Sequence, residues 1–326
     1  DKDTSSTKEL TKRFELLNKS DLNATDKIYQ LIEDCRNFGT LAFSHAARAG
    51  FVAVTMLKSL VKIGCLSQDR MLEFQASIPT VASEFQFALA NHNISTDDLI
   101  KRFGHLRPGT YDINQLAYWE DHSFYFVRGK QQRLDKDNCE HDFVFTSEER
   151  YGLKEVLKQL SVELEVDDFI EYMIKSIQAR ESVKFNFTRN LSAALDLMVH
   201  YGMETLGLTR EDVGFLTFDD IRSIRTGQIN ERLLPEFVKL RKLAFAEQQL
   251  AKLPSFISRE EDFFCFEQEK SEANFITRLM IIADLAFVKS DQAKTISGKI
   301  IAIPNADPGF DWIFSHDIAG LITQYG

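Results

Sequence analysis

Residues 166–207, VDDFIEYMIKSIQARESVKFNFTRNLSAALDLMVHYGMETLG, form the longest helical pattern in the chain and indicate its fold class. Apolar residues recur there at spacings of three and four, which places them on one side of an α-helix. Shorter patterns of the same kind precede and follow it, at 25–38, 41–64, 147–164, 217–224 and 230–253. The sequence therefore predicts a mainly α protein.

Helix starts and breaks can be placed from single residues. Thr25, Ser67, Ser95 and Thr217 each precede a helical pattern and are N-cap residue types. Gly39 is expected to interrupt the pattern that begins at Thr25. The stretch that follows, 41–64, is apolar nearly all round, as expected for a central helix.

The pattern changes after Pro254. Residues 263–266, 298–306 and 319–324 are short runs rich in β-branched or aromatic residues, and such runs between turn residues favour β-strands. We expect a boundary near residues 255–270, between a large helical domain and a small α/β segment. The polar stretch 129–142 has no useful period and is expected to be an exposed loop.

Composition and charge exclude several classes of protein. The chain has 326 residues, 44% of them hydrophobic, enough for a sizeable core. Its net charge of -10 argues against nucleic acid as a partner, because binding phosphates requires clustered Lys and Arg. Apolar runs are too short to span a bilayer and no secretory signal opens the chain. We therefore expect a cytoplasmic protein with no membrane partner.

Familiar catalytic and metal-binding motifs are absent from the sequence. It contains neither G-x-x-x-x-G-K-[ST] nor G-x-G-x-x-G, the common loops that bind phosphates. His residues do not occur at zinc-ligand spacing, so no metal site is predicted. The four cysteines are far apart and are expected to be ordinary reduced thiols.

Several cationic residues lie within otherwise apolar helical patterns. Arg48 lies near the expected break at Gly39, and Arg180, Lys184 and Arg189 lie near one face of the long helix. Buried arginines need either a partner or a ligand. Arg48 suits a ligand site and salt-bridged core packing equally. For Arg180, Lys184 and Arg189, a solvated helix face explains the pattern as well as a ligand site does.

The turn at residues 103–113, FGHLRPGTYDI, is denser in chemistry. An Arg107 guanidinium can grip a phosphate or carboxylate at two points, and a His105 with a near-neutral pKa can pass a proton. Gly109 allows a ligand to approach the backbone, and Tyr111 and Asp112 complete the candidate binding residues. The alternative is a purely structural turn, closed by an Arg107–Asp112 pair.

Four stretches of the sequence carry a family resemblance: RNFGTLAFSHAARAGF (36–51), FGHLRPGTYDI (103–113), ARESVKFNFTRN (179–190) and IPNADPGFDWIFSHDIAGLITQYG (303–326). Together they resemble the phosphoenolpyruvate-utilising enzymes. The likeness is greatest to phosphoenolpyruvate synthase-like proteins with the architecture of rifampicin phosphotransferase, and it extends from about residue 25 to the end. Its last stretch is the most specific.

The resemblance implies that different domains carry out different steps of the reaction. In that family an ATP-grasp domain phosphorylates a histidine on a small swivelling domain, and the histidine passes the phosphoryl group to an acceptor. Residues 1–260 would be the helical acceptor-binding or linker domain. Residues 261–326 would be an incomplete swivelling phosphohistidine domain. The chain begins with Asp1 and is expected to be a fragment, with the ATP-grasp domain before it.

The resemblance also places the carrier histidine after Gly326, so no catalytic residue is expected within the chain. His316 also follows a serine, but it precedes the strand that the family's carrier histidine follows. The segment from Asp307 to Trp312 would form the turn that shapes this domain. The chain itself would bind no cofactor, and ATP and Mg would belong to the full-length enzyme.

The resulting expectation is a fragment of an ATP-dependent, pyruvate,water dikinase-like phosphotransferase, inactive in isolation. Its partners would be the ATP-grasp domain and a small-molecule phosphoryl acceptor. The expected acceptor-binding residues are His105, Arg107, Tyr111, Asp112, Arg48, Arg180, Lys184 and Arg189. The alternative is a non-catalytic helical scaffold or partner-binding module whose polar residues are internal struts.

Overall fold

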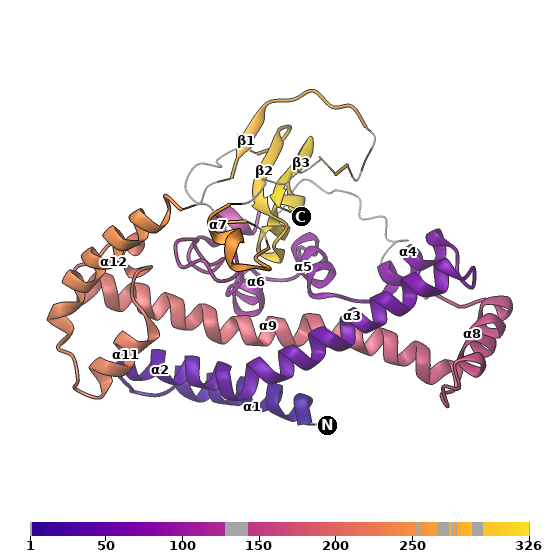
Figure 1. Ribbon diagram of the computed structural model, residues 1–326, viewed down its shortest axis with the longest axis horizontal. Coiled ribbons are helices and arrows are strands. Elements are labelled where there is room, and N and C mark those ends of the chain that lie inside the picture. The colour runs from indigo at the N-terminus through magenta and orange to yellow at the C-terminus, as the bar shows by residue number, and fades with distance from the viewer. Residues whose placement is uncertain are drawn as a thin grey trace.

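The computed structural model describes residues 2–127, 143–251, 253–254, 256–265, 274–275, 277, 279–288 and 296–325. The protein is mainly helical, with a small three-stranded sheet near its C-terminus, which confirms the predicted fold class (Figure 1). The loop expected at 129–142 lies outside the described residues.

The long helix α9, Val166–Glu204, runs along most of the molecule (Figure 1). Its 39 residues make a rod about 58 Å long at 1.5 Å per residue. Beside it lie α1 (Lys2–Asn18), α2 (Ala24–Asp34) and α3 (Thr40–Lys62). This confirms the single long helix expected from the pattern that begins at Val166.

Gly39 does not interrupt the helix that follows Asn23. A single π-helical turn, η1 (Cys35–Gly39), joins α2 to α3 without a break, and the Thr40 N–H donates to the Cys35 carbonyl five residues earlier. A Cβ at Gly39 would lie 2.5 Å from the Phe187 ring of α9. The glycine therefore allows close packing of two helices, and the prediction of a helix break there was wrong.

Helix α3 buries only one face. Small residues at Ala42, Ala46, Gly50 and Ala53 are buried along one side, whereas Phe51 on another side is 57% exposed. The expectation of a helix surrounded by core was therefore wrong. Within the described residues, the continuous stretch Ala24–Lys62 is long and apolar enough to cross a membrane by length and composition alone, a test that core helices of soluble proteins also pass.

The remaining helices cover the two ends and the middle of α9. One end carries α10 (Arg210–Val213), α11 (Phe218–Arg225), η3 (Glu231–Leu233) and α12 (Leu234–Gln248). The other end carries α4 (Gln68–Ser77) and α8 (Ser147–Gln159). Over the middle lie α5 (Val81–Ala90), α6 (Thr96–Phe103) and α7 (His122–Tyr125) (Figure 1).

Three of the four predicted N-caps are confirmed. The side chains of Ser67, Ser95 and Thr217 each accept a hydrogen bond from the backbone three residues on, as an N-cap should. The prediction for Thr25 was wrong, because Asn23 caps α2 by accepting from the Asp26 N–H.

The sheet consists of parallel strands in the order β1-β2-β3: β1 (Leu285–Phe287), β2 (Ile300–Asn305) and β3 (Gly320–Tyr325). Ile300 is in register with Leu285 on one side and Gly320 on the other. The strands expected at 298–306 and 319–324 are confirmed. The strand expected at 263–266 is wrong, since Glu260–Phe263 forms a 3-10 turn, η4.

The sheet shares its apolar core with the helices beneath it. Ile301 and Ile303 of β2 and Trp312 of the 3-10 helix η5 (Pro308–Ser315) pack in one cluster with Phe85 of α5 and Phe103 of α6. Trp312 is fully buried and lies against the Phe124 ring, with centroids 4.7 Å apart. The C-terminal segment is therefore held to the helical part by hydrophobic burial.

Candidate functional site

The turn at 103–113 lies directly beneath the C-terminal segment. Thr110 donates its hydroxyl to the Asp307 carboxylate at 2.9 Å, and the Tyr118 hydroxyl donates to the Gly309 carbonyl at 2.8 Å. Asp307 also accepts from the Gly309 N–H and so caps η5. Segments about 200 residues apart in sequence are thus held in contact by polar bonds.

Gly309 makes this contact possible. A Cβ at this position would lie 1.7 Å from the Arg107 carbonyl oxygen, so the two backbones approach more closely than any side chain permits. The resemblance implies that Gly309 lies in the turn that shapes the C-terminal domain. In the structure the residue also joins that segment to the turn at 103–113.

Replacing Gly309 with alanine is expected to separate these two segments and to lower the free energy of unfolding by about 1–2 kcal/mol. Urea unfolding measures the change. Gly320→Ala is the matched control in the same segment, because a Cβ there meets Ile300 at an ordinary 3.6 Å. Equal stability of the two variants would contradict the close approach at Gly309.

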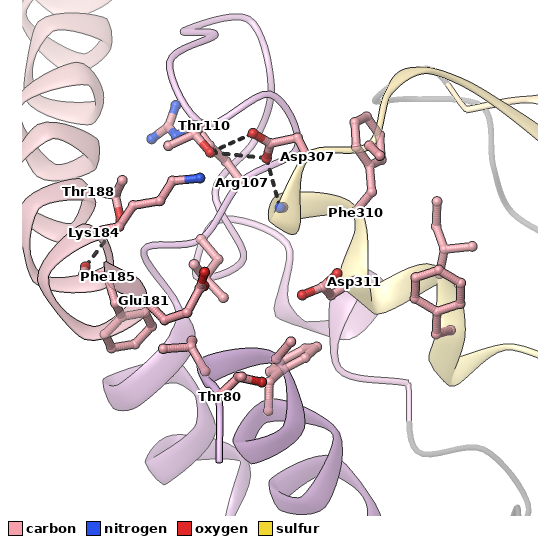
Figure 2. Close-up of a pocket in the computed structure, with 18 of the residues that line it drawn as sticks. Thr80, Arg107, Thr110, Glu181, Lys184, Phe185, Thr188, Asp307, Phe310 and Asp311 are labelled. Carbon is pink, nitrogen blue, oxygen red and sulfur yellow. Dashed lines mark hydrogen bonds between the residues drawn. The ribbon is translucent and has the colours of Figure 1, made fainter. Parts of the chain in front are cut away.

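A cavity of about 360 Å³ lies at this junction (Figure 2). Its walls come from the start of α5, the turn at 103–113, the middle of α9 and η5. Val81, Phe85, Phe310 and Ile313 contribute apolar surface. A hollow of this size, mostly apolar with a few polar groups, is typical of a small-molecule site.

Carboxylates and one lysine form the charged part of the cavity wall. Figure 2 shows Glu181 and Lys184 extending from α9, and Asp311 extending from η5, toward the space between them. Burial, and then the nearby carboxylates of Asp307 and Glu181, raise the pKa of Asp311 to about 7. Lys184 opposes this rise and makes no ion pair within 4.0 Å among the described residues.

Arg107 is a buried strut rather than a free anion grip. Its side chain is fully buried and donates to Ser192 Oγ at 3.0 Å, to the Gln115 carbonyl at 3.1 Å and to Asp196 Oδ1 at 2.5 Å. Trp119 Nε1 donates to the other Asp196 oxygen. These bonds tie the turn to α9 and leave the guanidinium no fork for an acceptor.

The alternative of an Arg107–Asp112 pair that closes the turn is also wrong. Asp112 is exposed and accepts instead from the backbone N–H of Asn114 at 2.9 Å, which closes a local turn. The partner of Arg107 is Asp196, 89 residues further along the chain. Spacing within the turn could not reveal a partner on another element.

His105 lines the cavity but does not have the near-neutral pKa expected of a proton carrier. Burial, and then the positive charges of Arg189 and Arg107, lower its pKa to about 3. The ring packs edge-on against Phe185, with centroids 4.4 Å apart. His105 is therefore a neutral imidazole at physiological pH.

The other expected binding residues lie outside the cavity wall. Tyr111 is 57% exposed, and Arg48 is exposed on α3, where it donates to Ser44 Oγ at 3.3 Å. Arg180 packs over the Phe51 ring, and Arg189 packs over the Phe14 ring. Of the eight predicted residues, His105, Arg107 and Lys184 line the cavity.

Sequence reasoning missed the acidic residues of the site. Glu181 lies three residues before Lys184 on α9 and shares its face, so helical spacing could have found it. Asp307 and Asp311 were noticed only as turn residues. Nothing in their local pattern indicates that they face α9, because that contact depends on the tertiary fold. Among the described residues, no group of His, Cys, Asp and Glu is arranged to hold a metal ion.

Comparison with known proteins identifies no family for this chain. No family model matches it, and no curated protein matches it. The resemblance to the phosphoenolpyruvate-utilising enzymes therefore stays a prediction that rests on its four sequence stretches.

Proposed function

We propose that the chain binds a small-molecule phosphoryl acceptor in the cavity, as part of an ATP-dependent phosphotransferase that works through a histidine carrier. The proposal rests mainly on one observation. Three of the four stretches that carry the family resemblance, at 103–113, 179–190 and 303–326, supply most of the wall of one cavity. Residues far apart in sequence can act on one ligand only if the fold brings them to the same site.

The charged groups suit acceptor chemistry. The Lys184 ammonium is a mobile point charge able to bind a phosphoryl oxygen. Asp311, with a pKa of about 7, is suited to accept the proton that an acceptor loses when its oxygen or nitrogen attacks phosphorus. In that step the bond from phosphorus to the carrier imidazole breaks, its electron pair returns to the ring nitrogen, and the new bond to the acceptor forms.

ATP and Mg would act elsewhere in the enzyme. The sequence has no Gly-rich phosphate loop, and the described residues provide no metal-ligand group, so none of the described residues is assigned to hold ATP or Mg. No step of the proposed chemistry here passes through them. The chain contributes the acceptor's pocket and its positioning.

The test uses the gene product with its native flanking sequence, incubated with ATP labelled at the γ-phosphate and with Mg. The expected result is an acid-labile, alkali-stable label on histidine that is discharged by a cell extract of molecules smaller than about 1 kDa. Lys184→Met should slow this discharge about 10–100-fold through the loss of one charge-assisted contact. A protein that never labels would refute the proposal.

Lys175→Met is the matched control. Lys175 lies on the same helix, is mostly exposed and pairs with Glu171, away from the cavity wall. Its replacement should leave discharge unchanged. If both variants discharge at the wild-type rate, Lys184 has no role in transfer.

The second candidate function is a non-catalytic scaffold. The observation in its favour is Arg107, which braces the turn against α9 through Ser192 and Asp196 as an internal strut would. The labelling experiment separates the two readings. For a scaffold, discharge of the phosphohistidine would not depend on the cavity, and Lys184→Met would behave like Lys175→Met.

A further inference from the structure

The polar side chains of the cavity are mostly hydrogen-bond acceptors. Glu181, Asp307 and Asp311 present carboxylate oxygens, against the ammonium of Lys184. The Arg107 guanidinium also lines the cavity, but its donors are taken by Ser192, Gln115 and Asp196. The Thr110 hydroxyl is already used, since it donates to Asp307. The Thr188 hydroxyl likewise donates to the Phe185 carbonyl at 3.1 Å. A ligand that supplies hydrogen-bond donors is therefore needed to satisfy the acceptors of the cavity wall.

His105 provides an independent indication of a missing donor. The side chain is 1% exposed and lines the cavity, and its Nε2 atom has no hydrogen-bond partner among the described residues. The backbone of Phe185 lies near the imidazole and favours a proton on the ring nitrogen that faces it. With that proton on Nδ1, Nε2 of the neutral ring is an acceptor. A buried acceptor without a partner costs about 1–3 kcal/mol, so a donor from a ligand would be favourable.

The charge of the cavity wall indicates which class of hydrogen-bond donor the ligand carries. With three carboxylates against Lys184 and Arg107, the cavity wall has a formal charge of -1 when all are ionised, and the Arg107 charge is already paired with Asp196. No described residue donates a hydrogen bond to the Asp311 carboxylate. A metal ion does not suit the described groups, because they do not form a metal-ligand cluster. An organic cation satisfies both the charge and the acceptors.

We infer that the molecule bound in this cavity carries an ammonium group, held by Asp311 and Glu181 near His105 Nε2, with its apolar part against Phe85, Phe310 and Ile313. This inference rests on the proposed function, since it names the class of acceptor for the same site. The acceptor is an aminated small molecule.

The experiment compares three probes on the 326-residue chain at about pH 8, by titration calorimetry or ligand-observed NMR. Cyclohexylmethylamine and cyclohexylmethanol have nearly the same shape and differ in charge, and myo-inositol supplies hydroxyl donors without charge. The amine is expected to bind at least about tenfold more tightly than the alcohol, since one charged contact contributes that much. Equal affinity, or tighter binding of inositol, overturns the inference.

Variants of single carboxylates show which side chains cause the preference for the amine. Asp311→Asn should reduce the amine preference to about one- to twofold, because it removes a charge that the amine needs and the alcohol does not. Glu181→Gln, on α9, should reduce it as well and serves if Asp311→Asn folds poorly. Asp317→Asn, an exposed position outside the cavity wall, should keep the full preference. A full preference in both cavity variants overturns the inference.

The outcome is separable from that of the proposed function. Amine binding needs neither ATP nor a phosphorylated histidine, whereas the labelling experiment needs both. If labelling fails while the amine preference holds, the cavity is an ammonium site outside any phosphotransferase. If labelling succeeds while the preference is absent, the acceptor is not aminated.

Discussion

Replacing Asp196 with alanine is expected to lower the free energy of unfolding by about 3–5 kcal/mol. The change leaves the fully buried Arg107 guanidinium without its counter-charge. It also removes the acceptor of the Trp119 indole N–H, which donates to Asp196 Oδ2 at 2.7 Å. A buried charge that loses its partner retains its desolvation cost without the compensating attraction.

Equilibrium unfolding in urea, followed by circular dichroism, measures this effect. Asp219→Ala is the control, since Asp219 is mostly exposed and forms a surface pair with Arg222, and it should change stability by less than about 1 kcal/mol. The double variant Arg107→Met, Asp196→Leu should recover much of the loss by burying apolar groups in place of charges. A cost below about 1 kcal/mol for Asp196→Ala would show that Arg107 is not held by this pair.

The same experiment bears on the choice between acceptor binding and scaffold. Because Arg107 is bound by Ser192, Gln115 and Asp196, its loss would damage folding whatever the chain does. Loss of activity on replacing Arg107 is therefore uninformative about ligand binding. The informative positions are Lys184 and Asp311, which face the cavity and whose side chains make no hydrogen bond or ion pair with other described residues.

The sequence predicts the helical body well because its signals are local. The spacing of apolar residues in 166–204 and the caps at Ser67, Ser95 and Thr217 depend on neighbours within one or two turns. Gly39 shows where this fails. A glycine in a helical pattern reads as a break, yet here it allows the Phe187 ring to pack against a π-helical turn.

The strands show the same limit. β2 and β3 are flanked by Gly and Pro and could be predicted, whereas β1 has only three residues, Leu285–Phe287, with no turn residues of that kind beside it. The run at 263–266 is aromatic enough for a strand, but its described part lies in and beside a 3-10 turn. Pairing with a neighbouring strand, and not composition, decides which runs become strands.

Only part of the candidate site could be predicted, because the rest depends on contacts between distant elements. The turn at 103–113 and Lys184 have residue types that suggest chemistry, and both line the cavity. Whether a polar side chain faces a ligand or a protein partner depends on distant elements. Asp196 takes Arg107 out of the candidate site, and burial beside two other carboxylates brings Asp311 into it.

Asp311→Asn is expected to stabilise the protein at alkaline pH and to have little effect in acid. The pKa of Asp311 is raised from 3.8 to about 7 in the folded state, first by burial and then by Asp307 and Glu181. The folded protein therefore binds the Asp311 proton more tightly than the unfolded chain does. The stabilisation from this proton is present below about pH 4 and is lost as pH rises toward 7.

Asparagine resembles the protonated carboxyl at every pH, so the variant lacks this loss. Between about pH 5 and pH 8 the wild type should lose up to about 2–3 kcal/mol of unfolding free energy relative to Asp311→Asn. Urea unfolding of both proteins across this pH range measures the difference in unfolding free energy. The titration of distant groups is the same in both proteins and cancels in this difference. The groups facing Asp311 are Asp307, Glu181, Lys184 and Tyr118, none of which is altered in the variant.

Asp317→Asn should follow the wild-type curve, because that exposed carboxyl does not face the cavity. Parallel curves for the wild type and Asp311→Asn would mean that Asp311 titrates as an ordinary carboxyl and is already ionised at neutral pH. The ammonium probe provides a further check on the wild type. A bound cation favours the ionised carboxylate, so saturating amine should reduce the loss of stability at pH 8, and the alcohol should not.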